Sequence, residues 1–239
     1  MHTDQINILQ KNLQKVQNDI KQYSNHLTDK AMLLAVSKYH QPNAIKVIFN
    51  AGVNNFAENF VQEAIPKIKY LPDEIIWHYT GAIQSNKIKK IAENFNWVHT
   101  LTNLTHAKKL DKQCSIFNKK MQVLIQINVD LDPHKSGILL HNQTELYHLV
   151  SGILQDCPNL NLQGISCMLK NTGDYNQQCN SFMKMYKLRQ KINTMFKAKL
   201  THLSMGTSTD MKAAIRSGST IIRIGTAIFG HYLKIHRHQ

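Results

Sequence analysis

Residues 221–230 read IIRIGTAIFG, with three isoleucines around one arginine and then a glycine and a threonine. The β-branched run predicts a buried strand, and Gly225 with Thr226 predicts a turn into a helix. Arg223 needs a partner inside such a strand, because burying an unpaired charge is very costly. The segment therefore predicts a strand-turn-helix unit that carries a charged side chain aimed at a ligand.

The same unit recurs along the chain. Seven further β-forming runs precede it, at 32–37, 55–57, 75–79, 97–101, 122–129, 162–168 and 200–204. Helical patterns fit between them at 42–51, 59–68, 84–95, 103–117, 143–154, 177–196 and 209–217. Alternation of apolar strands with helices favours a parallel sheet covered on both faces, and eight repeats favour closure. We predict a (β/α)8 TIM-type barrel, with an open doubly wound sheet as the alternative.

An amphipathic segment opens the chain. Its apolar residues recur every three or four positions: Ile6, Leu9, Leu13, Val16, Ile20, Tyr23 and Leu27. This spacing is typical of a helix that buries one face. We expect residues 1–30 to form an extra helix packed on the barrel, and residues 1–239 to form a single domain, because no linker composition interrupts the chain.

Composition argues against several classes of protein. The longest apolar runs are far shorter than the ~20 residues that span a bilayer, and the first residues do not resemble a signal peptide. Four cysteines without a C-x-x-C pair predict free thiols and no metal site. We therefore expect a cytoplasmic protein with no membrane segment.

The formal net charge of +14 makes nucleic-acid binding a hypothesis. The positive residues are mostly lysines spread over many segments, whereas arginine, the better residue for bidentate contacts to phosphates and bases, is scarce. The chain is also rich in Asn and Ile, so biased residue usage accounts for the lysines. We expect no functional binding of nucleic acid.

Candidate site residues follow from the barrel itself, because functional side chains gather at the carboxyl ends of its strands. By that rule the candidates are Lys38, Asn59, His78, Ser204, Arg223, Gly225 and Thr226. The last two strands of such barrels often end at a phosphate site, and free backbone N–H groups in a turn can hold an anion.

Some of these residues have a second interpretation. Lys38 either extends outward or points into a pocket, and His78 is either a site residue or a core histidine. Residues 135–137, Lys-Ser-Gly, form either a loop turn or a phosphate contact. The final residues hold three histidines that a metal would suit, although a solvated terminus explains them better: His231, His236 and His238.

Six motifs of the chain resemble those of the YggS/PROSC family, the pyridoxal 5′-phosphate homeostasis proteins. They are AVSK (35–38), FAENFVQEA (56–64), WHYTGAIQSNK (77–87), INVDLDPHKSGI (127–138), LSMGTSTDMKAAIRSGST (203–220) and IRIGTAIFG (222–230). They run in order over nearly the whole chain after the first helix. Because the family resembles the barrel domain of alanine racemase and is generally monomeric, the resemblance implies a monomeric barrel.

The resemblance also implies roles for individual residues. Lys38 is similar to the lysine that forms a Schiff base with the cofactor aldehyde, and Arg223 to the group that faces the pyridine nitrogen. Asn59 lies in a segment near the cofactor ring, with His78 as a further candidate contact. The implied phosphate seat consists of Ser204 and the backbone of Gly225 and Thr226.

Three residues depart from the family pattern and affect only contacts at the flank of the ring. Ala57, Phe60 and Thr80 stand where the family usually has glycine, tyrosine and an apolar residue.

Arg223 also bears on whether the cofactor is used for catalysis. An arginine only donates hydrogen bonds, so it favours an unprotonated pyridine nitrogen and a poor electron sink. Few residues follow the last strand, so we expect no second domain to supply another base, and no catalytic residue is assigned. We predict a protein of pyridoxal phosphate homeostasis, with PLP-dependent apoenzymes as possible partners. A monomeric PLP-dependent amino-acid racemase is the alternative.

Overall fold

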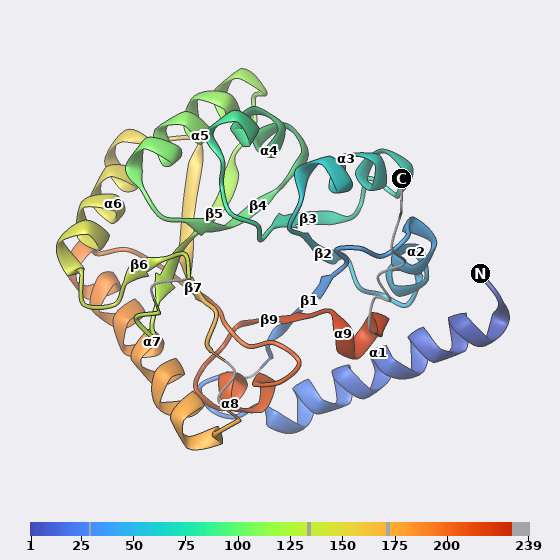
Figure 1. Cartoon of the computed structure of the whole chain (residues 1–239). Coiled ribbons are helices and arrows are strands. Elements are labelled where there is room, and N and C mark those ends of the chain that lie inside the picture. Colours follow the sequence, from blue (N-terminus) through green and yellow to red (C-terminus); the bar gives the residue numbers. More distant parts are fainter. Residues whose placement is uncertain (29, 133–134, 171–172, 231–239) are drawn as a thin grey trace.

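Eight parallel strands close into a barrel in the computed structural model, which describes residues 1–28, 30–132, 135–170 and 173–230 (Figure 1). The ring consists of β1 (Met32–Val36), β2 (Asn55–Glu58), β3 (Ile76–Tyr79), β4 (Trp97–Leu101), β5 (Met121–Asn128), β7 (Leu160–Cys167), β8 (His202–Ser204) and β9 (Ile221–Ile224). Successive members pair in parallel, and β9 returns to β1 with Arg223 opposite Leu34. The predicted barrel is confirmed, and the alternative of an open sheet is wrong.

Helices surround the barrel on its outside (Figure 1). They are α2 (Pro42–Asn50), α3 (Val61–Tyr70), α4 (Ile88–Asn94) preceded by the 3-10 turn η1 (Ser85–Lys87), α5 (Leu104–Ile116), α6 (Gln143–Asp156), α7 (Tyr175–Phe196), α8 (Met211–Arg216) and α9 (Thr226–Phe229). Three of these helices begin at a side chain that accepts a hydrogen bond from a first-turn amide. The cap residues are Asn103, Asn142 and Asp174.

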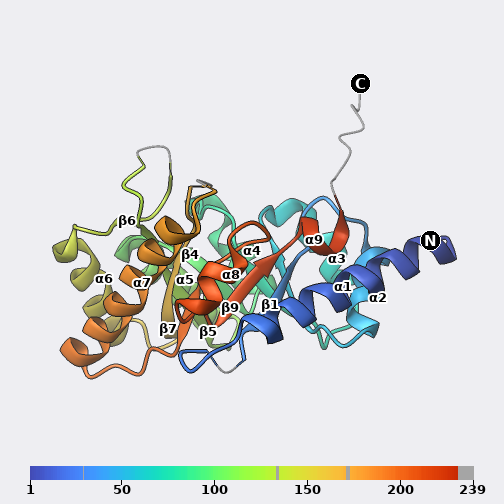
Figure 2. The ribbon, with the colours of Figure 1, turned by 90° about the horizontal axis from the view of Figure 1, so that it is seen from below.

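The predicted N-terminal helix is α1 (Thr3–Tyr23), which precedes the barrel. It lies along the flank of the barrel in the side view and contacts α2, α8 and α9 (Figure 2). The residues that it buries belong to the predicted stripe: Leu9, Leu13, Val16 and Ile20. The Asn12 amide also donates a 3.1 Å hydrogen bond to the Ile228 carbonyl, which ties the helix to the end of the barrel.

One short strand was not predicted. It is β6 (Ile138–Leu139), which pairs in parallel with Ile127 and Asn128 of β5, beyond the part of β5 that pairs with β4. Gly137 permits this approach, because its φ is +128° and a Cβ there would lie 2.7 Å from the Asn128 nitrogen. Two residues are too few for a period-2 pattern, so sequence alone gives no strand signal here.

The barrel has two cores. The large one lies between the sheet and the helices, whereas a small separate cluster comprises Leu34, Ala57, Leu124 and Ile221. Arg223 lies two residues after Ile221 on β9, and buried polar residues of β3, β4 and β8 are His78, His99 and Ser204. Polar side chains so deep in a barrel require hydrogen-bond partners, which makes them the place to look for a site.

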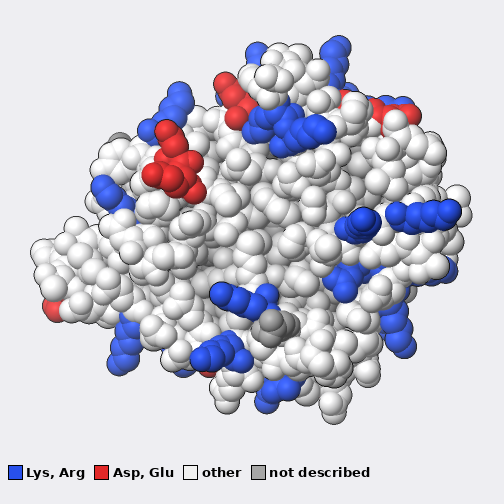
Figure 3. All heavy atoms as spheres, turned by 180° about the vertical axis from the view of Figure 1, so that it is seen from behind, with Lys and Arg blue, Asp and Glu red and all other residues white. Residues whose placement is uncertain are grey.

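Positive side chains on the face opposite to that of Figure 1 are scattered among uncharged residues and form no single continuous patch (Figure 3). Within the described ranges, no helix combines the length and the apolarity that crossing a membrane requires.

Candidate functional site

A cavity of about 530 Å³ opens at the carboxyl ends of the strands. Five of the predicted site residues line it: Lys38, Asn59, Arg223, Gly225 and Thr226. The other two, His78 and Ser204, are fully buried and are not part of its wall. The structure therefore separates residues that a ligand can touch from residues that lie beneath them.

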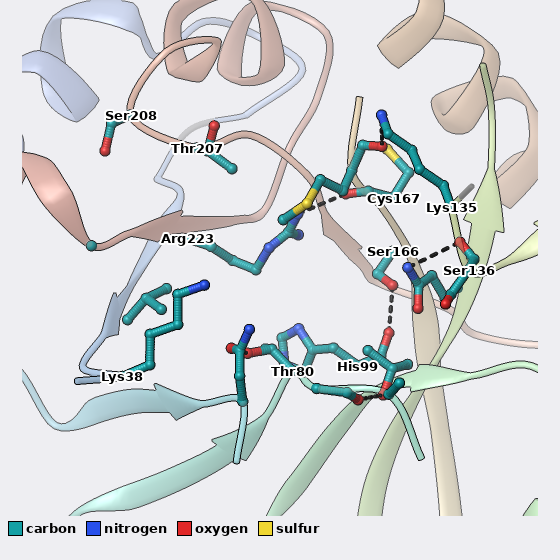
Figure 4. Close-up of a pocket in the computed structure, with 18 of the residues that line it drawn as sticks. Lys38, Thr80, His99, Lys135, Ser136, Ser166, Cys167, Thr207, Ser208 and Arg223 are labelled. Carbon is teal, nitrogen blue, oxygen red and sulfur yellow. Dashed lines mark hydrogen bonds between the residues drawn. The ribbon is translucent and has the colours of Figure 1, made fainter. Parts of the chain in front are cut away.

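Lys38 and Arg223 extend into the same space (Figure 4). Their closeness follows from barrel closure, since β1 and β9 are paired neighbours and Lys38 comes shortly after β1 ends. Lys38 is half-buried, and its Nζ lies 5.7 Å from the centre of the Tyr39 ring. An amine and a guanidinium thus face one cavity from adjacent strands.

Neutral oxygens hold Arg223 in place. Its Nη1 donates to the carbonyl and hydroxyl oxygens of Ser204 at 2.6 and 2.8 Å, and its Nη2 donates to the Cys167 carbonyl at 2.7 Å. These bonds use three of the five N–H groups of a guanidinium, which leaves N–H groups for the cavity. Burial lowers the pKa of Arg223, while Cys167 and Asp210 act in the opposite direction.

Ser204 begins a hydrogen-bonded chain that runs down through the barrel. His99 Nδ1 lies 2.9 Å from the Ser204 hydroxyl, His99 Nε2 lies 2.9 Å from His78 Nδ1, and His78 Nε2 lies 3.0 Å from Asn55 Oδ1. We call Asn55, His78, His99 and Ser204 the histidine chain. Because the Asn55 oxygen only accepts, His78 carries its hydrogen on Nε2. His99 must then donate from Nε2 and accept from Ser204.

Both histidines of this chain are neutral at physiological pH. Burial lowers the pKa of His78 to about 3, and it lowers the pKa of His99 well below the usual 6.5. After burial, the neighbouring His78, Arg223 and His202 lower the pKa of His99 further, in that order. The chain consequently supports a buried cation with dipoles alone.

A second group of cavity residues lies in the turns after β8 and β9. Thr207, Ser208 and Thr209 line the cavity, as do Gly225 and Thr226. Figure 4 shows Thr207 and Ser208 in the turn after β8. Gly206 starts the first turn with φ +98°, and a Cβ on it would lie 2.5 Å from the Ala214 Cβ. The hydroxyls of Ser208 and Thr209, with the amides of the first turn of α9, suit an anion such as a phosphate.

The Asp210 carboxylate shapes this turn. It accepts hydrogen bonds from the backbone amide and the hydroxyl of Thr207 at 2.6 and 2.8 Å.

Asn59 lies on the wall formed by β2 and β3. Its Oδ1 accepts a 2.8 Å hydrogen bond from the Thr80 hydroxyl. Thr80 is one of the departures from the family pattern, and here its hydroxyl orients the amide of Asn59. Gly81 follows, where a Cβ would lie 2.0 Å from the Asn59 carbonyl, so only glycine fits.

The opposite wall comes from the ends of β5 and β7 (Figure 4). Lys135 and Ser136 both line the cavity and lie in the loop between β5 and β6, where the Lys135 amide donates a 3.1 Å hydrogen bond to the Asp132 carbonyl. Lys135 Nζ lies 3.2 Å from Asp130 Oδ2 and 3.3 Å from the Met168 carbonyl. Burial raises the pKa of the Cys167 thiol to about 12, so it is protonated.

Metal ligands are not gathered here: the described residues contain no group of three or more His, Cys, Asp or Glu side chains arranged to hold an ion. The histidines at 231, 236 and 238 lie outside the described residues.

Sequence reasoning missed His99 and the hydroxyls at 207–209. His99 lies two residues after Trp97 in the strand sequence WVHTL, so alternation along the strand places these two side chains on the same face of the sheet. The sequence places the phosphate contact of this turn at Ser204. In the structure, the Ser204 hydroxyl points to Arg223 and His99 and away from the cavity.

Known proteins give this geometry a context. The family model described as alanine racemase, N-terminal domain, matches residues 11–233. A pyridoxal phosphate homeostasis protein of Vibrio alginolyticus is 40% identical over 230 residues, which cover 93% of this chain and 97% of that protein. The protein of the same name from Escherichia coli strain K12 is 38% identical over 202 residues, covering 83% of this chain and 84% of the relative.

A solved structure agrees with both sequence comparisons. PipY of Synechococcus elongatus, with PLP bound, superposes with a TM-score of 0.81 at 27% identity, covering 93% of this chain and all of PipY. A family match over most of the chain, close relatives and a shared fold lead to one conclusion. The chain belongs to the alanine racemase N-terminal domain family and, within it, to the pyridoxal phosphate homeostasis proteins.

Proposed function

We propose that this protein binds pyridoxal 5′-phosphate in the cavity and holds it as a Schiff base on Lys38. The observation that carries the proposal is that Lys38 and Arg223 face one cavity from paired strands, beside a turn rich in hydroxyls. An amine suits the aldehyde, spare N–H donors suit the ring nitrogen, and the turn suits the phosphate. The relatives' names and the PLP-bound structure of PipY support it.

Each wall of the cavity has a part in this proposal. Arg223 donates to the pyridine nitrogen, and Asn59 lies beside the ring. The phosphate contacts come from Gly225, Thr226 and the hydroxyls of Ser208 and Thr209. Ser204 and His78, which do not line the cavity, act through Arg223 instead of touching the cofactor.

The covalent step needs nothing beyond the two reactants. The Lys38 nitrogen forms the new C=N bond, and the aldehyde oxygen leaves as water, so no oxidant or reductant takes part. Hydrolysis reverses the step and releases the aldehyde. A reversible link of this kind suits a protein that stores and returns a reactive aldehyde.

Because of Arg223, we propose that the protein binds the cofactor without catalysing a reaction with it. Its partners are neutral oxygens, so its full positive charge faces the cavity and disfavours protonation of the ring nitrogen. An unprotonated ring is a weak electron sink. We propose a cytoplasmic monomer that contributes to PLP homeostasis, with PLP-dependent apoenzymes as recipients.

Visible absorbance of the protein mixed with PLP tests the assignment. We expect an imine band in the wild type that Lys38→Ala abolishes, with affinity reduced at least about tenfold. Borohydride reduction followed by mass mapping should place the label on Lys38. The exposed Lys46→Ala serves as the control and should behave like the wild type.

An unchanged spectrum and affinity in Lys38→Ala would show that the assignment is wrong. Sustained, Lys38-dependent isotope exchange at the α-carbon of a free amino acid would favour a racemase instead.

A further inference from the structure

A buried group of charges lies beside Lys38, outside the wall of the cavity. Lys67 of α3 places its Nζ 2.7 Å from Glu58 Oε1 and 2.6 Å from Glu63 Oε1. The side chains of Lys67 and Glu58 are 7% and 0% exposed, and that of Glu63 is 27% exposed. We call Glu58, Glu63 and Lys67 the Lys67 cluster.

The cluster holds both chain neighbours of Lys38. On one side, Ser37 accepts a 2.9 Å hydrogen bond from Lys67 through its carbonyl and donates a 2.7 Å bond from its hydroxyl to Glu58. On the other side, the Tyr39 amide donates a 2.5 Å bond to Glu63. The residue that carries the reactive amine is thus fixed from both ends by one set of charges.

The backbone at this point needs such support. Tyr39 has φ +69°, a left-handed conformation that is unfavourable for a residue with a Cβ. That conformation reverses the chain directly after Lys38, and the 3.1 Å bond from the His40 amide to the Ser37 carbonyl completes the turn. Loss of the hydrogen bond to Glu63 would therefore destabilise the turn at residues 37–39 relative to an extended conformation.

Stability alone is a poor explanation for the cluster. Buried ion pairs seldom stabilise a fold more than well-packed apolar residues of the same size, because desolvation offsets the attraction. Here the cost is visible, since Glu58 Oε2 has no hydrogen-bond partner among the described residues. The same face of α3 already packs Val61 and Ala64 into the core. Apolar residues were therefore an available solution at position 67.

We propose that Glu63 and Lys67 are positioning residues, which hold the segment 37–39 so that the Lys38 side chain enters the cavity. The proposal rests on the proposed function, because Lys38 is useful in the cavity only if it reacts with an aldehyde there. Misplacing a reacting group by about 1 Å can cost two orders of magnitude in rate. A defect in this cluster should therefore appear in the covalent step before it appears in recognition of the ring.

Two ligands separate these steps. Pyridoxal 5′-phosphate can react with Lys38, whereas pyridoxine 5′-phosphate has the same ring and phosphate but no aldehyde. The variants are Glu63→Ala, which removes the acceptor for the Tyr39 amide, and Glu63→Gln, which keeps an oxygen there. The exposed Glu74→Ala is the control. Affinities for both ligands, the rate of imine formation and the thermal midpoint are measured on each protein.

We expect Glu63→Ala to weaken PLP binding about tenfold and to slow imine formation, with pyridoxine phosphate affinity within about twofold of the wild type. Glu63→Gln should recover most of the PLP affinity. Equal losses for both ligands, or no loss for either, would overturn the positioning role. The wild type is measured first. If it binds the two ligands equally and forms no imine, the proposed function itself is wrong.

Discussion

Two buried polar networks support Arg223 and Lys38, and they differ in charge. Under Arg223 lies the histidine chain, in which each member is neutral and hydrogen-bonded along one direction. Beside Lys38 lies the Lys67 cluster, in which two carboxylates share one ammonium group and one carboxylate oxygen has no partner among the described residues. The neutral network orients a cation, and the charged network fixes a stretch of backbone.

The difference follows from what each network must leave free. A carboxylate against Arg223 would neutralise the charge that the cavity presents, so dipoles and carbonyl oxygens hold the guanidinium instead. Lys38 needs a free amine. The carboxylates of the Lys67 cluster therefore accept hydrogen bonds from its neighbours, Ser37 and Tyr39, and not from its side chain. In both cases the reactive or recognising atoms face the cavity.

The largest effect should come from breaking the charged network. Lys67→Met leaves the Glu58 carboxylate buried without its cation, so we expect the free energy of unfolding to fall by about 3–5 kcal/mol. Urea unfolding at pH 7 measures this change. Lys69→Met, two residues away and exposed, is the matched control and should shift stability by less than about 0.5 kcal/mol. A similar stability for both variants would refute the idea that the cluster depends on its cation.

Acid should affect the neutral network next most strongly. The pKa of His78 is lowered in the folded state, so its contribution to stability is complete above pH 6.5 and is lost progressively as the pH falls toward 3. Between pH 7 and 5 the neutral His78 should cost about 2 kcal/mol of unfolding free energy. Unfolding at the two pH values should show that loss reduced in His78→Gln.

The exposed His148→Gln is the reference for this experiment and should keep the wild-type pH dependence. The same dependence in His78→Gln would mean that His78 is not held neutral.

The smallest expected effect has the opposite sign and sharpens the comparison. Burial raises the pKa of Glu58, with Lys67 opposing, so Glu58 stabilises the fold more as the pH falls. Glu58→Gln removes that gain and should lose stability more steeply than the wild type on acidification. The difference is at most about 1.4 kcal/mol per pH unit. Parallel pH profiles for the two proteins would argue against a raised pKa.

Sequence reasoning succeeded where the pattern was long and regular. Each of the eight predicted strands is present, because apolar runs and helical periodicity repeat around the ring. Positions at strand ends also brought Lys38, Asn59 and Arg223 to one face without any three-dimensional information. What sequence could not supply was direction at single residues: Ser204 and His78 stand at the predicted ends but point beneath the cavity.

The Lys67 cluster illustrates the same limit on a helix. Lys67 has the charge of a surface residue, and α3 also carries the exposed Lys69. Its spacing of three from the buried Ala64 is compatible with the buried face of α3. A fully buried lysine is rare, however, so sequence alone predicts a surface position for Lys67. The partners that make its burial tolerable come from β2 and from its own helix, and only the folded chain brings them together.

The pairing of β1 with β9 has a consequence for how the cavity comes into being. Lys38 follows the first strand of the ring and Arg223 lies on the last strand. Most of the chain is therefore synthesised between these two cavity residues. Such distant contacts form late in folding because the loop entropy must be overcome first. A newly made chain therefore has no seat for its ligand until the ring closes. A ligand that binds in the cavity therefore stabilises the closed barrel relative to any partly folded state.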